Sequence, residues 1–510
     1  MPAYDASMTD AIEPPVIEPR GAELPAGGAE PEDEDVRSHT TSGRANVELL
    51  FVGLGALVVS LSQSVLVPVL GELQREFGSS ANWLLTSTLL VAAVSVPIMG
   101  RLGDMFGKRL MLLVAMGALT AGSLIDALSQ DFGWLVVGRA IQGASSGAIP
   151  LGISLLATLM PKERVASSVA LISAMLGVGG SLGLPLAGFV AEHWDWHTLF
   201  WINTVVGVLA FIGILSVVPE SHHREGGRVD IIGGILLSGG LVCLILPLQQ
   251  GHQWGWSSGR VWGLLVASVV IMGVFAAYEL RRRDPLVDLA ALRRRPILTT
   301  NLASICFGFA LFASFIGTST FIEAGTWTGY GFASSLLTGG LALLPSGLAM
   351  LLFAPVAAGM IAKRGAPQTL ALGASIVAVG WVLRIVMTGS LWEVIVGTTV
   401  IGIGTGIGYA AMPSLINAYT PSNEIAAANG LNTLFRSLGS TLATAVGTSI
   451  LASSLVYHAV NGQVVEGASS LTAYRWLFAV CALASVLAAG LVLTIPSNRR
   501  QVVPPVGASV

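Results

Sequence analysis

Long apolar runs fill the chain from about residue 47 onwards, and they restrict how it can fold. A helix needs about 20 apolar residues to cross the hydrocarbon layer of a bilayer, and polar breaks divide this part of the chain into fourteen such runs. Apolar residues make up 53% of the sequence and charged residues only 11%, which is unlike a soluble domain. The runs are continuous rather than alternating, which excludes a membrane β-barrel. The sequence therefore predicts an all-α integral membrane protein with fourteen transmembrane helices.

Residues 1–46 differ from the rest of the chain in composition. They are rich in Pro, Gly, Glu and Asp, and they hold ten acidic residues and three arginines. Such a segment has too little apolar surface to offset the entropy lost on ordering, so a disordered acidic tail is predicted. No signal pattern of charged, apolar and small residues precedes the first run, and we expect no cleaved secretory peptide.

The distribution of basic residues predicts the orientation in the membrane. If the N-terminus is cytoplasmic, 20 of the 26 lysines and arginines fall in cytoplasmic segments, three fall on the other side and three lie within the runs. Because cytoplasmic loops carry the excess of positive charge, both termini are predicted to be cytoplasmic. Three lysines against 23 arginines suggest a high-GC bacterium, so the bacterial inner membrane is the expected location.

Two parts of the chain resemble each other in the positions of glycine and proline. The offset stays between 258 and 260 residues for the pairs Gly107 and Gly365, Gly138 and Gly397, Gly143 and Gly402, Gly147 and Gly406, Pro161 and Pro421, and Gly179 and Gly439. This register predicts two six-helix bundles in a parallel repeat, over residues 47–218 and 296–496. Residues 219–295 then form a linker with two extra transmembrane helices and a basic loop, and residues 497–510 form a cytoplasmic tail. Parallel repeats are typical of transporters whose site lies between the halves.

The loop after the second predicted span reads Gly-Arg-Leu-Gly-Asp-Met-Phe-Gly-Lys-Arg over residues 100–109. It resembles the loop signature of the major facilitator superfamily, although Met105 stands where that family usually has a basic residue. Asp104 is placed to accept hydrogen bonds from the N-terminus of a neighbouring helix, and the two basic residues are expected to face anionic lipid. An ordinary basic turn is the alternative. The resemblance implies a gating motif of Gly100, Asp104, Gly107, Lys108 and Arg109.

The fourth span carries Leu135-x-x-x-Arg139-x-x-Gln142-Gly143, which is similar to a second motif of the family. An arginine inside a span costs about 2.5–3.5 kcal/mol on insertion scales, so it should face a polar cavity or a partner. The resemblance implies that Arg139 and Gln142 belong to the transport cavity. A purely structural arginine, bonded to backbone carbonyl groups, is the alternative.

The fifth span reads Gly-Val-Gly-Gly-Ser-Leu-Gly-Leu-Pro-Leu-Ala-Gly over residues 177–188 and is similar to the motif that marks antiporters of the superfamily. Proline removes a helix hydrogen bond, and glycines allow close contact at the bend. A glycine-rich packing face without a role in transport is the alternative. Residues 196–203 resemble the family's entrance to the sixth span, so the chain resembles the fourteen-helix drug:proton antiporter branch. The expected kink involves Gly180, Gly183, Pro185 and Gly188.

One departure from that branch concerns proton coupling. Its first span usually carries an aspartate, whereas residues 62–64 here read Ser-Gln-Ser. Glu323, near the outer end of the ninth span, is the preferred proton carrier, and Asp126 is the second choice because the family's fold makes its span peripheral. Arg384 matches Asp126 by the repeat and is expected to extend to the membrane surface. The candidates for cavity or coupling roles are Gln63, Arg139, Gln142, Glu323, Asn432 and Arg436.

The sequence therefore predicts a secondary transporter that exports small hydrophobic or amphipathic compounds, of drug or antibiotic type, by alternating access. Proton antiport, a lipid bilayer environment and a monomeric state are expected. One alternative is an exporter of anionic metabolites or lipids, because the spans hold three arginines and fewer acids. The other alternative is a membrane sensor that moves no substrate.

Other classes of protein need residues that this sequence lacks. It contains neither a Gly-x-x-x-x-Gly-Lys-Ser/Thr loop nor a His-Glu-x-x-His motif, so an ATP-driven pump, an enzyme and a bound cofactor are not expected. Cys243, Cys306 and Cys481 form no paired spacing, which predicts free thiols and no metal site. There is no basic face for nucleic acid.

Overall fold

The computed structural model describes residues 42–220, 229–282, 285–421, 424–460 and 463–495. All of them belong to one compact unit, which extends from Thr40 to Val510. The two predicted tails, residues 1–46 and 497–510, lie almost entirely outside the described residues.

The first half of this unit is helical throughout. Its helices are α2 (Ser42–Ser64), α3 (Leu66–Phe77), α4 (Asn82–Phe106), α5 (Lys108–Leu128), α6 (Phe132–Ala144), α7 (Ala148–Leu159), α8 (Lys162–His193) and α9 (His197–Val217). Short 3-10 turns, η1 (Gly78–Ala81) and η2 (Ser145–Gly147), precede α4 and α7. The pairs α2 with α3 and α6 with α7 each make one continuous span.

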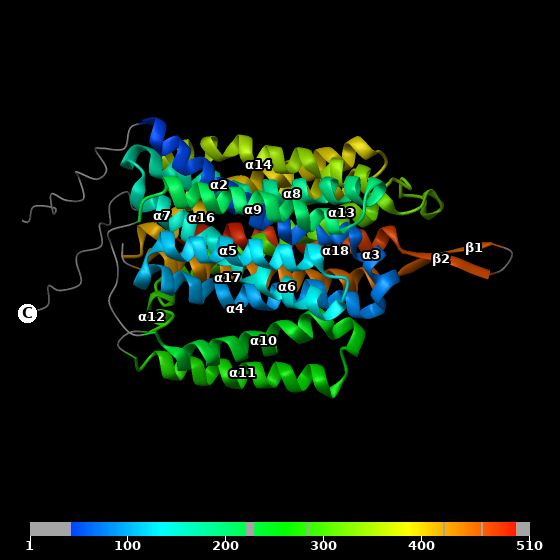
Figure 1. The fold of residues 1–510 in the computed structure, drawn as a ribbon. Coiled ribbons are helices and arrows are strands. Elements are labelled where there is room, and N and C mark those ends of the chain that lie inside the picture. Colours follow the sequence, from blue (N-terminus) through cyan, green and yellow to red (C-terminus); the bar gives the residue numbers. More distant parts are fainter. Residues whose placement is uncertain (1–41, 221–228, 283–284, 422–423, 461–462, 496–510) are drawn as a thin grey trace, which may run out of the picture. The chain divides into compact units, whose positions relative to one another are not determined.

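The helices α10 (Ile231–Trp254) and α11 (Gly259–Glu279), with the short α12 (Leu289–Leu292), separate the first half from the second. The remaining elements are α13 (Arg295–Glu323), η3 (Thr326–Thr328), α14 (Leu336–Arg364), α15 (Ala366–Val386), α16 (Leu391–Ala418), α17 (Ile425–Ala452), β1 (Leu455–Val460), β2 (Gln463–Ser469) and α18 (Leu471–Leu493). The two strands form an antiparallel hairpin, which projects from the helix ends opposite α12 (Figure 1).

Within the described residues, 13 helices are long and apolar enough to cross a membrane. They match thirteen of the fourteen predicted spans. The prediction that is not matched falls on α17, a helix of 28 residues. This helix buries polar side chains such as Asn429, Asn432 and Arg436, which lower its mean hydropathy.

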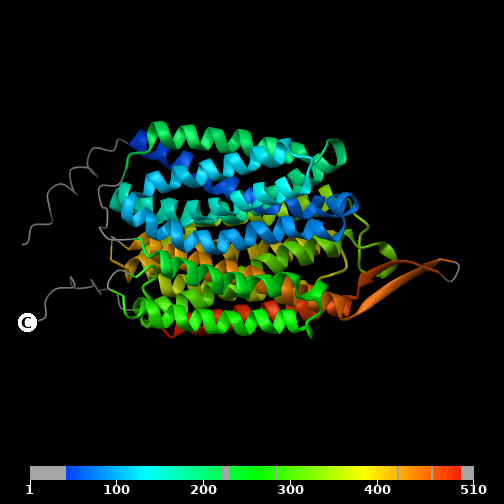
Figure 2. The same cartoon turned by 60° about the horizontal axis from the view of Figure 1, so that its bottom comes forward.

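Helices α10 and α11 pack against each other at the side of the other helices, as Figures 1 and 2 show. Only α10 of this pair makes extensive contacts beyond it, with α4 from the first half and α17 from the second. Exposed apolar side chains such as Val266, Val269 and Val270 cover α11. A surface of this kind fits contact with lipid.

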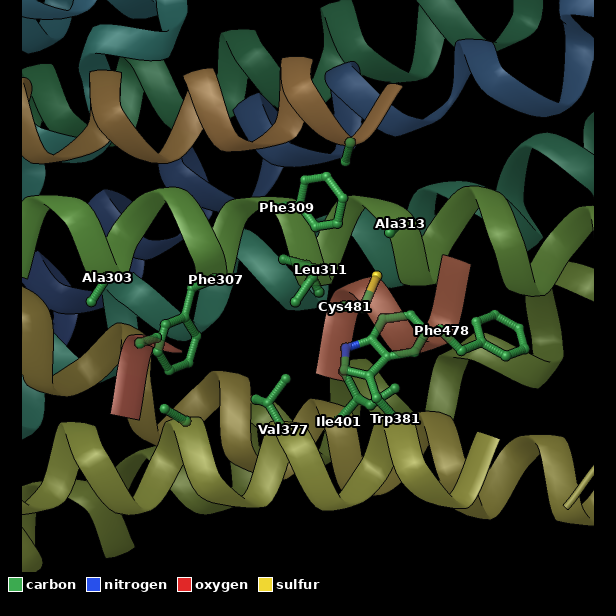
Figure 3. Packing of buried hydrophobic residues seen from close by; sticks show 14 of the residues in the cluster. Ala303, Phe307, Phe309, Leu311, Ala313, Val377, Trp381, Ile401, Phe478 and Cys481 are labelled. Atoms are coloured by element: carbon green, nitrogen blue, oxygen red, sulfur yellow. The ribbon is translucent and has the colours of Figure 1, made fainter. Parts of the chain in front are cut away.

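The largest apolar cluster lies in the second half. It joins α13, α15, α16 and α18 around Phe307, Trp381, Ile401 and Phe478, and Figure 3 shows these side chains gathered between the helices. A second cluster joins α2, α5, α7, α8 and α9 of the first half. Cys481 lies in the first cluster, and all three cysteines are free, as predicted.

Candidate functional site

The loop between α4 and α5 binds the start of α17. The carboxylate of Asp104 accepts hydrogen bonds from the backbone N of Ala426 at 3.3 Å and of Ala427 at 2.8 Å. A side chain at position 100 would not fit, because its Cβ would lie 2.7 Å from the carbonyl O of Ala426. The expected bonding of Asp104 to a helix N-terminus is therefore present, and it joins the two halves of the chain.

Lys108, one of the two basic residues of the same loop, does not lie where the sequence suggested. Lys108 is 1% exposed, and its Nζ lies 3.8 Å from Oδ1 of Asp104. Arg109 donates through its guanidinium to the carbonyl O of Leu215 at 2.6 Å. The expectation that Lys108 faces lipid is wrong, because the helix start is packed inside the protein.

Glu220 is a residue of this loop region that the sequence reasoning missed. Its carboxylate accepts hydrogen bonds from the backbone N of Arg109 at 3.0 Å and of Leu110 at 3.2 Å. Gly107 has a φ of 120°, which favours glycine, and a Cβ there would lie 2.8 Å from the Glu220 carboxyl carbon. The sequence feature that could have identified it is an acid directly after the sixth span, because the first N–H groups of a helix such as α5 are free to bind a carboxylate.

A cavity of about 100 Å³ lies between the two halves. Both halves supply its walls: α2, α3, η2, α7 and α8 from the first, and α13, α16 and α17 from the second. The polar and charged side chains in its lining are Ser60, Gln63, Ser64, Ser146, Tyr409, Thr433, Arg436, Ser437 and Ser440, and the apolar ones include Leu176, Phe312 and Phe315.

Of the predicted cavity residues, Gln63 and Arg436 line this cavity, together with Gly180. The Arg436 guanidinium lies 4.8 Å from the centre of the Tyr409 ring and donates to Oγ1 of Thr433 at 3.2 Å. Asn432 instead lies behind the wall, where its amide donates to Oδ1 of Asn301 at 2.9 Å and to Oγ of Ser304 at 2.7 Å. It ties α17 to α13.

Tyr409, Phe312 and Phe315 of the lining were not predicted from the sequence. Their positions within apolar helices carry no pattern that separates a cavity wall from ordinary packing. Arg139, Gln142 and Glu323 are not among the lining residues.

The glycines of α8 make close contacts with both halves. A Cβ at Gly180 would lie 2.8 Å from the Phe315 ring, and one at Gly188 would lie 2.7 Å from the backbone N of Leu337. Gly183 approaches Ser64 of α2, and Pro185 approaches Gly340 of α14. The glycine face thus allows α8 to pack against α2, α13 and α14, as the packing alternative requires, while Gly180 also reaches the cavity.

Arg139 is buried in a network of hydrogen bonds. One guanidinium nitrogen donates to Oε1 of Gln142 at 2.6 Å and to the carbonyl O of Ser62 at 3.2 Å. Nε donates to the carbonyl O of Leu84 at 3.4 Å. The amide of Gln142 donates to Oδ2 of Asp126 at 2.8 Å. Asp126, on a helix that was expected to be peripheral, is 0% exposed and faces α6.

Arg384 is also fully buried, which corrects the expectation that it extends to the membrane surface. Its guanidinium lies 5.1 Å from the centre of the Phe321 ring and 4.8 Å from that of Phe478. None of its side-chain nitrogens has a hydrogen-bond partner among the described residues. Glu323 is half-buried at the end of α13 and bonded to Ser319, one turn earlier.

Among the described residues there is no group of three or more His, Cys, Asp or Glu side chains that could hold a metal ion. The fold and the cavity instead define a class: a multi-pass membrane protein whose two halves enclose a central, partly polar space. This is the architecture of a membrane transporter.

The comparison with known families agrees with this class. The model of the Major Facilitator Superfamily matches residues 52–344 and 324–508. The chain therefore belongs to the major facilitator superfamily, and it is a transporter and not an enzyme.

Several relatives of the chain carry names that refer to export or resistance. The tetracenomycin C resistance and export protein of Streptomyces glaucescens is 28% identical over 423 residues, which cover 81% of this chain and 77% of that protein. The probable actinorhodin transporter of Streptomyces coelicolor is 27% identical, covering 84% and 77%. Multidrug resistance protein 3 of Bacillus subtilis is 25% identical, covering 80% of each.

A solved structure has the same fold. The human organic anion transporter MFSD10 (TETRAN) superposes with a TM-score of 0.62 at 15% identity, covering 88% of this chain and 99% of that chain. At this identity the likeness concerns the fold alone.

Proposed function

We propose that this protein exports small hydrophobic or amphipathic compounds from bacteria by alternating access, in exchange for protons. The observation that supports this most is the cavity built from both halves of the chain. The names of the relatives, which refer to export and to multidrug resistance, point in the same direction.

The cavity and the loop contact together suggest how access alternates. Pockets for drug-sized ligands measure about 300–1,000 Å³, whereas the cavity here has about 100 Å³. The halves therefore have to move apart to admit such a substrate. The hydrogen bonds from Asp104 to α17 hold one end of the two halves together, so we infer that they break when this end opens.

The proposal includes a membrane topology. We count α17 as a membrane span, the thirteenth of fourteen in chain order, because it is long enough at 28 residues and packs between α4, α7 and α13. The two six-helix bundles then comprise α2 to α9 and α13 to α18, with both termini cytoplasmic, and the protein works as a monomer in the inner membrane. The basic residues at Arg293–Arg295, beside α12, support the assignment of that end to the cytoplasm.

The lining of the cavity favours amphipathic substrates. Phe312, Phe315 and Leu176 offer apolar contact, and Gln63 and Thr433 offer hydrogen bonds. Arg436 is the one charged side chain among the described lining residues. This last feature supports a second candidate function, the export of anionic compounds, because a cation in a cavity of low polarity attracts anions.

Transport by inside-out vesicles with an imposed pH gradient tests both candidates. A cationic dye such as ethidium, a neutral compound and an anion such as fluorescein are compared. Uptake of at least one compound that depends on the gradient is expected. Absence of uptake for every class of compound would contradict the proposal and support the alternative that the protein is a membrane sensor that moves no substrate.

A further inference from the structure

Asp126 of α5 is a buried acid that does not line the cavity. It is 0% exposed, and only its Oδ2 has a hydrogen bond, from Gln142 at 2.8 Å. Oδ1 has no partner among the described residues. It points towards Gly138 of α6, whose missing side chain leaves room for it. A carboxylate with one unpaired oxygen is costly to bury, so this arrangement fits the protonated acid.

Gln142 joins Asp126 to Arg139 without direct contact between the two charges. Its amide nitrogen donates to Asp126, while its amide oxygen accepts from Arg139 at 2.6 Å and from Oγ of Ser62 at 3.0 Å. The bridge is neutral. A negative charge on Asp126 would therefore compete with Gln142 and with the Ser62 carbonyl group for the guanidinium of Arg139.

This network lies directly behind the wall of the cavity. Ser62 precedes Gln63, which lines the cavity and donates to Oγ of Ser146 at 3.1 Å. Both residues of that bond face the substrate space. A change in the bonds of Arg139 would thus move the part of α2 that carries Gln63.

We propose that Asp126 is the proton-carrying group of this transporter and that Gln142 passes its charge state through Arg139 to the cavity wall. This inference rests on the proposed proton antiport. On uptake, an O–H bond forms at the carboxyl group of Asp126. On release that bond breaks, its electron pair stays on the carboxylate, and the proton passes to water.

The helices around Asp126 hold few other titratable groups. Helix α5 packs against α4, α6, α7 and α9. Arg139 is the titratable residue of α6, and α7 has none. His197 begins α9 and lies close to the carbonyl O of Ser129, beyond the end of α5. Arg101 and Asp104 of α4, and Lys108 and Arg109 of α5, stand at the far ends of their helices.

Polar side chains without partners offer a route for the proton. Ser123 lies one turn before Asp126 on α5, and Asn203 lies on α9, which packs along α5. Both are 0% exposed, and their side-chain polar atoms have no hydrogen-bond partner among the described residues. Such groups can bond water molecules that relay protons.

The test compares two readouts in proteoliposomes of the full chain. One is uptake of ethidium or fluorescein driven by a pH gradient, and the other is exchange of the same compound at equal pH, which needs no proton. Asp126→Asn is expected to lower gradient-driven uptake about tenfold or more, a size typical of coupling between two sites, and to keep exchange. Glu192→Gln, on the exposed end of α8, serves as the control that keeps both.

The outcomes separate this inference from the proposed function. If the wild type itself shows no gradient-driven uptake, the proposed proton antiport is contradicted, whatever the variants do. Gradient-driven uptake that persists in Asp126→Asn, or that is lost in Glu323→Gln but not in Asp126→Asn, would overturn the assignment to Asp126. Should Asp126→Asn fail to insert, Asp126→Glu gives the same test: a shifted pH dependence of uptake is expected, and an unchanged one contradicts the proposal.

Discussion

The carboxylate of Asp104 accepts a hydrogen bond of 2.8 Å from the backbone N of Ala427, 323 positions further along the chain. The bond joins the end of α4 to the first turn of α17. A carboxylate at a helix N-terminus is stabilised by the helix dipole, by about 0.3–1 kcal/mol at exposed sites and up to about 2 kcal/mol when partly buried. An interaction of this size can hold two halves closed and still be broken in each cycle.

Replacing Asp104 should therefore affect transport more than folding. Asp104→Asn keeps the size of the side chain but loses the charge, and we expect transport of ethidium or fluorescein by vesicles to fall about tenfold, a typical coupling effect. Glu163→Gln, an exposed acid at the start of α8, is the matched control. Unchanged transport in Asp104→Asn, or failure of this variant to insert, would contradict the view that the hydrogen bonds of Asp104 hold the two halves closed.

The close approach of α8 to α14 predicts that Gly188 does not tolerate a methyl group. Its Cβ would lie 2.7 Å from the backbone N of Leu337, and overpacking of this kind costs about 1–3 kcal/mol. Gly188→Ala should lower the melting temperature in detergent, whereas Gly239→Ala on α10, with nothing within 4 Å, should not. Equal melting temperatures for the two variants would show that the contact relaxes freely.

The burial of Arg384 changes what its substitution should do. Arg384→Ala would leave a void between the Phe321 and Phe478 rings, and losses of about 2–5 kcal/mol are usual for large buried side chains. Arg384→Met fills the space without a charge, and such replacements of buried charges are often neutral or stabilising. We expect the melting temperature to fall for Ala and to hold for Met. If Arg384→Ala melts like Arg260→Ala, whose arginine is exposed, the packing argument fails.

Arg436 should influence whether the protein prefers anionic or cationic substrates. It is the charged residue in the described cavity lining, so Arg436→Gln should weaken binding of fluorescein and favour ethidium. In surroundings of low polarity, a single contact between opposite charges changes the binding affinity by a factor of about ten or more. Binding titrations of both dyes to the purified protein measure this. Parallel changes for the two dyes would indicate a structural role instead.

Much of the fold could be predicted from the sequence because it depends on local composition. Runs of about 20 apolar residues suffice to predict a membrane helix. The mean hydropathy of α17 is lower than that of the other long helices, because Asn432 and Arg436 interrupt its apolar face. The contact of Asp104 with a helix N-terminus could be predicted from the loop pattern, because a carboxylate between two helices can accept hydrogen bonds from the free N–H groups at a helix start.

The sequence did not predict which way a side chain faces within a helix that is buried on several sides. Asp126 and Arg384 belong to helices that the family resemblance placed at the periphery, so Arg384 was expected to extend to the membrane surface and Asp126 was only the second choice for the proton. In the structure Gly138 leaves room for Asp126 beside α6, and the rings of Phe321 and Phe478 enclose Arg384. Such contacts depend on the packing of helices distant in sequence.

Alternating access between the two halves is the central claim, and locking one end of the cavity tests it most directly. In a variant with Cys243, Cys306 and Cys481 replaced by Ser, Asp104→Cys and Ala427→Cys are joined by a short thiol crosslinker that a reductant can cleave. Uptake of ethidium or fluorescein by proteoliposomes is measured before crosslinking, after it and after reduction. Because Asp104→Cys also removes the carboxylate, transport before crosslinking is expected to be about tenfold below that of the wild type. Crosslinking should stop this residual transport, and reduction should restore it to the level before crosslinking. Residual transport that is unchanged with the crosslink in place would contradict alternating access.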